Sequence, residues 1–226
     1  VGTHCALFAA DERGRLTLLS RISTPNPQMV WFSADSRTLA VAMPDRRVVL
    51  WDVSDPTDPR QAGAVSGLDS TPISIAFAPR SHLLAVGTES GRVSVWDTAD
   101  PTRTTRVREF GDPHAAPNCV LFSPDERMLI AASGDERIWG WDLTQTADDT
   151  PEFTLSVGVD RPWDVRFLAG GRMAVSGGNG ALRVWGIDPD RASSELCDLR
   201  GDPLSETEWS RYLPGITVAD PCRGTR

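Results

Sequence analysis

The feature that most constrains this chain is a tryptophan that recurs at a nearly constant interval. Each copy closes a short run rich in β-branched residues, and three of the four copies are followed by aspartate. An interval of about 45 residues identifies a repeat architecture, because each repeat must then be one supersecondary unit. The four residues are Trp51, Trp96, Trp141 and Trp185.

A second set of landmarks keeps the same interval. Each interval also holds four short apolar runs, bounded by glycine, proline, aspartate or serine, as strands joined by turns are. Four strands for each repeat of about 45 residues predict an all-β fold, a β-propeller segment of about four four-stranded blades and a partial blade. The landmarks are Pro27, Pro72, Pro117 and Pro162, then Phe32, Phe77, Phe122 and Phe167.

The repeat divides the chain into expected parts. Aligning residues 14–20 with residues 91–97 places Leu19 at the position of Trp96, so the first hairpin is predicted to be a degenerate inner pair of strands. The chain thus starts inside a repeat, and we expect it to be the C-terminal part of a longer propeller. The propeller segment is expected at 1–187, with a partial blade at 1–22 and blades at about 27–66, 67–110, 111–157 and 158–187.

The pattern changes in residues 188–226. Ala192, Leu196 and Leu199 lie on one face at helical spacing, and Ser205 to Glu208 has the form of a capping box. Two short helices are therefore predicted in this C-terminal tail.

Composition limits the partners of the chain. The net charge is −8, and all 23 basic residues are arginine. Because nucleic-acid affinity rests on clustered cations, this charge argues against a nucleic-acid partner. No apolar run approaches the roughly 18 residues of a membrane span, so no membrane partner is expected. The lack of lysine, beside abundant alanine, glycine, proline and arginine, indicates a GC-rich bacterial genome.

The four cysteines are scattered and none has CxxC spacing. Their spacing therefore matches neither a zinc ribbon nor a redox motif. Free thiols in a reducing cytoplasm are the favoured interpretation, and a link between Cys197 and Cys222 is the alternative. The other two are Cys5 and Cys119.

Three complete repeats resemble the WD-repeat family. Their sequences, WFSADSRTLAVAMPDRRVVLWD, AFAPRSHLLAVGTESGRVSVWD and LFSPDERMLIAASGDERIWGWD, are similar to its Phe-Ser-Pro-Asp turn, Leu-Ala strand, Asp-containing hairpin and Trp-Asp ending. The resemblance covers about residues 4–187. It implies a structural tetrad of hydrogen-bonded side chains in the third full unit, with His114 offset by about one residue: His114, Ser133, Asp135 and Trp141.

The tetrad is incomplete in the other units. In the second unit Asp69 stands near the histidine position, and the fourth unit keeps only Asn179 and Trp185. The tail is also similar to those of actinobacterial WD-repeat proteins, many of which carry an upstream signalling NTPase, protease or kinase domain. That similarity implies a receptor or sensor role, with upstream blades and an effector domain in the same chain.

Candidate catalytic and metal-binding groups are few. His114, Ser133 and Asp135 include the residue types of a hydrolytic triad, but the same positions belong to the implied tetrad, where Ser133 would bond to Trp141. His82 has no neighbouring histidine or cysteine, which argues against a metal. Gly177 to Gly180 lie between two strands, so they form a hairpin turn and not a phosphate cradle. No cofactor is expected.

Two sets of loops are candidates for binding. Acidic residues recur after the tryptophan strands, and a solvated rim, a docking surface for a basic partner and a calcium site are the alternatives, in that order of preference. The loops before the first strands supply candidate partner-binding residues. Trp163 lies two residues before Val165 and so on the same face of the strand, which predicts that it packs between blades. Trp31 and Trp139 are expected to pack in the same way. The candidates are Asp69, His114, Asp160, Arg161 and Trp163; the acidic residues are Asp52, Asp55, Asp58, Asp97, Asp100, Asp142, Asp148, Asp149 and Glu152.

The leading hypothesis is a non-catalytic protein-interaction scaffold or sensor module of a larger bacterial signalling protein, located in the cytoplasm. A propeller enzyme is the first alternative, and it would need reactive groups at the channel end of the first strands. A purely structural module is the second. The residues at that channel end are Met29, Ser74, Asn118 and Asp164.

Overall fold

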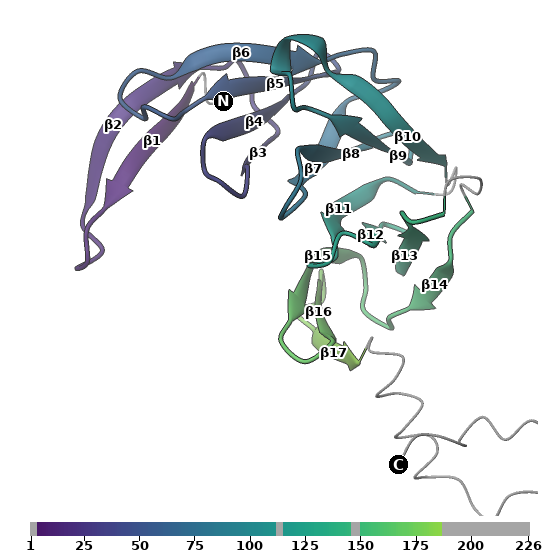
Figure 1. The fold of residues 1–226 in the computed structure, drawn as a ribbon. Coiled ribbons are helices and arrows are strands. Elements are labelled where there is room, and N and C mark those ends of the chain that lie inside the picture. Colours follow the sequence, from purple (N-terminus) through teal and green to yellow (C-terminus); the bar gives the residue numbers. More distant parts are fainter. Residues whose placement is uncertain (1–3, 112–114, 146–149, 187–226) are drawn as a thin grey trace, which may run out of the picture. The chain divides into compact units, whose positions relative to one another are not determined.

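The computed structural model describes residues 4–111, 115–145 and 150–186, and almost all of its regular elements are β-strands (Figure 1). The predicted all-β fold is confirmed, because successive strands pair as antiparallel meanders. The helices predicted in residues 188–226 lie outside the described residues. Within the described part, no helix is long and apolar enough to cross a membrane.

Three four-stranded sheets follow one another along the chain, and we call them blades 1 to 3. Blade 1 contains β3 (Met29–Phe32), β4 (Thr38–Met43), β5 (Arg47–Asp52) and β6 (Arg60–Val65). Blade 2 contains β7 (Pro72–Phe77), β8 (Leu83–Thr88), β9 (Arg92–Asp97) and β10 (Thr105–Gly111), with a short 3₁₀ helix, η1 (Pro101–Arg103), before β10. Blade 3 contains β11 (Pro117–Phe122), β12 (Met128–Ser133), β13 (Arg137–Asp142) and β14 (Phe153–Ser156).

Two further sheets have fewer strands. One pairs β1 (His4–Ala10) with β2 (Leu16–Ser23), and blade 4 orders β15 (Pro162–Leu168), β16 (Arg172–Gly177) and β17 (Leu182–Gly186). The chain divides into two compact units, Val1–Arg166 with Ala174–Arg183, and Phe167–Met173 with Val184–Arg226. The core clusters and both cavities described below lie in the first unit.

The first hairpin, β1–β2, was predicted to be the inner pair of strands of a blade. The structure corrects this prediction, because the pair occupies the outer positions of a blade. A short connection leads from Ser23 to the first strand of blade 1, as it does from the outer strand β6 to β7. Ile22 on β2 is 1% exposed and packs against β4 and β5, as Phe110 on the outer strand β10 packs against blade 3. The alignment failed because the degenerate hairpin has lost the tryptophan that marks a third strand.

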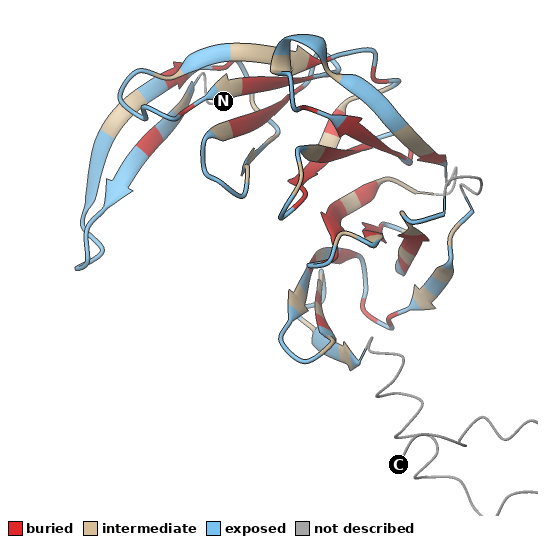
Figure 2. Ribbon diagram, in the orientation of Figure 1, coloured by how far each residue is buried: buried red, intermediate tan, exposed pale blue. Residues whose placement is uncertain are grey.

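The core lies between neighbouring blades. One cluster joins blades 1 and 2, and a second joins blades 2 and 3, where the rings of Phe110 and Trp141 lie 5.1 Å apart. Figure 2 shows the buried residues concentrated on the inner strands of these blades, while β1 and β2 are largely exposed. Burying each large apolar side chain stabilises the fold by about 1.5–3 kcal/mol, so each blade depends on its neighbour.

The aspartate that follows three of the four repeat tryptophans caps the loop after it. Asp52 accepts the Ser54 backbone N–H at 2.9 Å, and Asp142 accepts the Thr144 hydroxyl at 2.7 Å. These hydrogen bonds, from the Ser54 N–H in the first case and the Thr144 hydroxyl in the second, hold the pKa of each carboxyl below its ordinary value. The residues expected to form an acidic rim therefore have a local role in shaping their loops.

Candidate functional site

The first strands of blades 1 to 4 meet around a cavity of about 350 Å³, which we call the channel cavity. One position of the repeat recurs in its wall, at the start of each first strand. This position is occupied by four different residues: Met29, Ser74, Cys119 and Asp164.

Side chains at this position tie each blade to the next. The Met29 sulfur accepts the Ile75 backbone N–H at 3.4 Å, and the Ser74 hydroxyl oxygen accepts the Val120 N–H at 2.7 Å. Both bonds join a side chain of one blade to the backbone of the following blade. Because methionine sulfur is a weaker acceptor than a serine hydroxyl, the two hydrogen bonds join equivalent positions but differ in strength.

Cys119 is 6% exposed and donates its thiol proton to Asp164 Oδ1 at 3.4 Å. Burial raises the pKa of this thiol to about 11, and the neighbouring Asp164 carboxylate adds to the effect. Because only the thiolate is a good nucleophile, the buried thiol is unreactive at neutral pH.

Charged and aromatic groups surround the Cys119 thiol. The Arg166 guanidinium forms an ion pair with Asp164 at 2.9 Å and lies over the Trp31 ring, 5.2 Å from its centroid. Asn118 Nδ2 donates to the Pro162 carbonyl at 3.0 Å, which links blades 3 and 4. The wall of the cavity therefore presents a cation, a carboxylate, an amide and an aromatic ring together.

Trp163 lies at this cavity with 64% of its surface exposed, so the expected packing between blades is wrong for this residue. The equivalent residues Ile73 and Asn118 fall in β-bulges, between Pro72 and Ser74 and between Pro117 and Cys119. A bulge adds one residue to a strand and breaks its alternation. Strict parity along the strand therefore misplaces this position, whereas Trp31 and Trp139 do pack against the core, as expected.

The loop before β15 is held by the hairpin between β16 and β17. The Gly178 backbone N–H donates to the Asp160 carbonyl at 2.7 Å and to the Arg161 carbonyl at 3.2 Å. A Cβ at Gly177 would lie 2.7 Å from the Asp160 carbonyl oxygen, so only glycine fits there. The glycine-rich turn was predicted as a hairpin, and it also fixes Asp160 and Arg161 beside Trp163.

Asp69, another candidate partner-binding residue, is tied into its own blade. Its carboxylate accepts hydrogen bonds from Thr88, at 3.1 Å, and from Ser90, and Arg92 lies 3.4 Å away. A carboxylate with three such partners shapes its blade, so it is a weak candidate for a partner contact.

The described members of the predicted tetrad do not bond to one another. Ser133 donates to the Ala115 carbonyl at 3.3 Å, and Asp135 accepts from the Arg137 backbone N–H at 3.2 Å. Within the described residues, the buried Trp141 indole nitrogen has no hydrogen-bond partner. His114 lies outside the described residues, so the tetrad as a whole stays a prediction.

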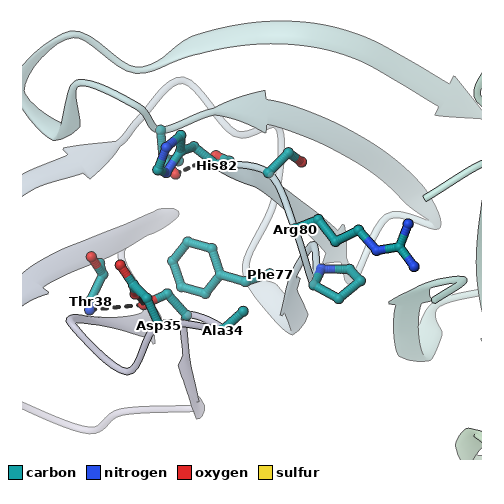
Figure 3. Close-up of a pocket in the computed structure, with 10 residues that line it drawn as sticks. Ala34, Asp35, Thr38, Phe77, Arg80 and His82 are labelled. Atoms are coloured by element: carbon teal, nitrogen blue, oxygen red, sulfur yellow. Dashed lines mark hydrogen bonds between the residues drawn. The ribbon is translucent and has the colours of Figure 1, made fainter. Parts of the chain in front are cut away.

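A second cavity of about 330 Å³ lies between the β3–β4 turn of blade 1 and the β7–β8 turn of blade 2; we call it the turn cavity (Figure 3). Its wall includes Asp35, Phe77, Ser81 and His82. The sequence placed His82 in a turn without metal partners, but nothing in the repeat pattern indicated a cavity there.

Catalytic and metal-binding groups are sparse in the part of the chain that the structure describes. No group of three or more histidine, cysteine, aspartate or glutamate side chains there could hold a metal ion. The channel cavity offers Cys119 and Asp164, but the thiol is protonated at neutral pH and the carboxylate is paired with Arg166.

Comparison with known proteins identifies the repeat. Residues 64–97 and 105–142 match the family model described as WD domain, G-beta repeat. These two stretches are therefore similar to WD repeats. Each matched stretch runs from the outer strand of one blade through the first three strands of the next, so sequence repeat and blade are offset by one strand.

Solved structures share the β-propeller fold of this chain. A chain in the "Crystal Structure of Mitotic Checkpoint Complex" is similar with a TM-score of 0.66 and 17% sequence identity, over 82% of this chain and 56% of that chain. This chain thus spans little more than half the length of that relative. At this identity the likeness shows the fold alone, a β-propeller segment. A search of curated proteins gave no significant match.

Proposed function

We propose that this chain is a non-catalytic protein-interaction module whose partner binds at the mouth of the channel cavity. The observation that carries the proposal is the exposed Trp163, held on a strand beside the Arg166–Asp164 pair. Tryptophan and arginine dominate the binding energy of protein interfaces when they sit on a well-packed support. Interlocked blades provide that support, and the loops at their ends are where binding residues usually lie.

We also infer a setting for the module. The resemblance of the tail to actinobacterial WD-repeat proteins supports a place in a larger cytoplasmic bacterial signalling protein. Partner binding at the propeller would there be relayed to an effector domain of the same chain.

Partner capture from the host tests this proposal. Full-length protein carrying Trp163→Ala should lose a specific bound protein, because truncating an interface tryptophan costs on the order of 2 kcal/mol or more. Val107→Ala is the matched control, since Val107 is 53% exposed on the outer strand β10, away from the cavity wall. Equal capture by wild type and Trp163→Ala would overturn the proposed site, and measurable turnover of a bound substrate would overturn the non-catalytic assignment.

A further inference from the structure

We propose that the turn cavity is a second binding site, which takes a basic side chain, arginine or lysine, from a partner polypeptide. The site is separate from the channel mouth, because it is built from the turns at the other end of the first strands. Its failure would leave the proposal for Trp163 untouched.

The charged group of the turn cavity is the Asp35 carboxylate. Its Oδ1 accepts the Ser33 hydroxyl at 2.6 Å and the Arg37 backbone N–H at 3.1 Å. These bonds, the Ser33 hydroxyl first, lower the pKa of Asp35, so the carboxylate is ionised at neutral pH. Among the described residues Oδ2 has no hydrogen-bond or ion-pair partner, which leaves it available to a ligand.

Asp35 differs in this respect from several other carboxylates of the described part. Asp45, Asp58 and Asp164 each form an ion pair with an arginine two residues further along the chain. The nearest cation to Asp35 in sequence, Arg37, contributes its backbone N–H and forms no ion pair with it. Arg80 also lines the cavity, but it forms no ion pair with Asp35, so the described residues present a negative charge there without a paired cation.

The rest of the cavity fits the stem of a long basic side chain. Phe77, 9% exposed, offers one apolar ring face, against which methylene groups or a guanidinium plane can pack. The buried Ser81 hydroxyl has no hydrogen-bond partner within the described residues, so it can accept a donor from the ligand. In the view of Figure 3 the Phe77 ring lies between Asp35 and His82, and the Arg80 guanidinium extends away from both.

The next junction between blades shows what closes such a cavity. There the Glu126 carboxylate of blade 3 accepts the backbone N–H groups of Arg80 and Ser81 in the turn of blade 2. Glu126 corresponds in the repeat to Ser81, whose side chain is too short to reach the turn of blade 1. The gap left at the first junction is the turn cavity.

Ligand-observed NMR on the full-length protein tests the site. The probe is Nα-acetyl-arginine methylamide, and its neutral isostere Nα-acetyl-citrulline methylamide is the control ligand. Asp35→Asn keeps the shape and the Oδ1 acceptor but removes the charge. Asp125→Asn is the matched control, because Asp125 accepts the Ser123 hydroxyl and the Arg127 N–H at the same 2.6 and 3.1 Å but does not line the cavity.

We expect wild type and Asp125→Asn to bind the arginine probe alike, and Asp35→Asn to bind it roughly fivefold more weakly, as for the loss of a partly exposed ion pair. Citrulline should bind wild type as weakly as arginine binds Asp35→Asn. Ala34→Leu, a change at an exposed rim residue, should weaken binding by filling the cavity while the charge remains. Equal binding by Asp35→Asn and Asp125→Asn, or equal binding of both probes by wild type, would refute the site.

Discussion

The Cys119 side chain contributes both to packing between blades and to the pH dependence of stability. Its thiol is buried between blades 3 and 4 and donates to Asp164. The sequence predicted a free thiol, and the structure confirms that Cys119 is free. Its burial was not predictable from residue type, because it depends on the first strand of the next blade.

Titration of Cys119 makes stability depend on alkaline pH. The thiol ionises near its ordinary value of 9.0 when unfolded and near about 11 when folded, so the folded state keeps a proton that the unfolded state loses. Its contribution is complete below about pH 9, and by pH 11 the free energy of unfolding should fall by about 2–3 kcal/mol.

Urea unfolding between about pH 8 and 11 measures this loss. Cys119→Ser places in blade 3 the residue that blade 2 already has at Ser74, and it should flatten the profile. The chain has no lysine, so few other groups titrate in this window. Identical profiles for wild type and variant would exclude Cys119 as the cause.

The turn that closes the first hairpin differs between blades. Blades 1 and 3 close their first hairpin in the same way: a serine donates to an aspartate two residues on, and the aspartate accepts a backbone N–H. The Ser-x-Asp pattern made these turns predictable from sequence. The turn of blade 2 has Ala78 and Arg80 instead, and its missing bonds are replaced by Glu126 from blade 3. No local pattern could indicate that contact, because it joins two repeats.

Glu126→Ala should therefore lower the free energy of unfolding more than an alanine substitution at the equivalent turn position of blade 1. It leaves two backbone N–H groups without their acceptor, which costs about 1–3 kcal/mol. Ser36→Ala is the control, since Ser36 holds the same turn position with φ 58°, against 62° for Glu126, and both changes place alanine in the left-handed region. Thermal or urea unfolding compares the stability of the two variants. Equal losses of stability would mean that the hydrogen bonds from Glu126 to blade 2 do not stabilise the fold.

At the scale of the whole molecule, periodicity made the fold predictable. Two sets of landmarks at the same interval specified four-stranded units, and three such sheets follow one another along the chain. The four residues expected at the channel end of the first strands all line the channel cavity: Met29, Ser74, Asn118 and Asp164. Trp163 and the turn cavity were missed, because bulges and neighbouring blades place side chains where one strand's alternation does not.

The uncovered sheet at β1–β2 predicts self-association. Phe8 and Leu18 are paired across the two strands and, with Leu16, form an exposed apolar face, and the sheet contains only β1 and β2 among the described residues. Such faces and edges pair with other chains. The 226-residue chain alone should form concentration-dependent oligomers in sedimentation velocity, and Leu16→Glu with Leu18→Glu should reduce them. A wild-type monomer at every concentration would contradict this expectation.

The hydrogen bonds that run from Met29 to Ile75 and from Ser74 to Val120 have a consequence for how such chains can change. In each bond the donor is a main-chain group, which every residue except proline supplies, so only the acceptor must be supplied by the sequence. A whole repeat could be copied or removed and the new neighbours would still be joined. The number of blades can therefore change by duplication without a new junction having to arise.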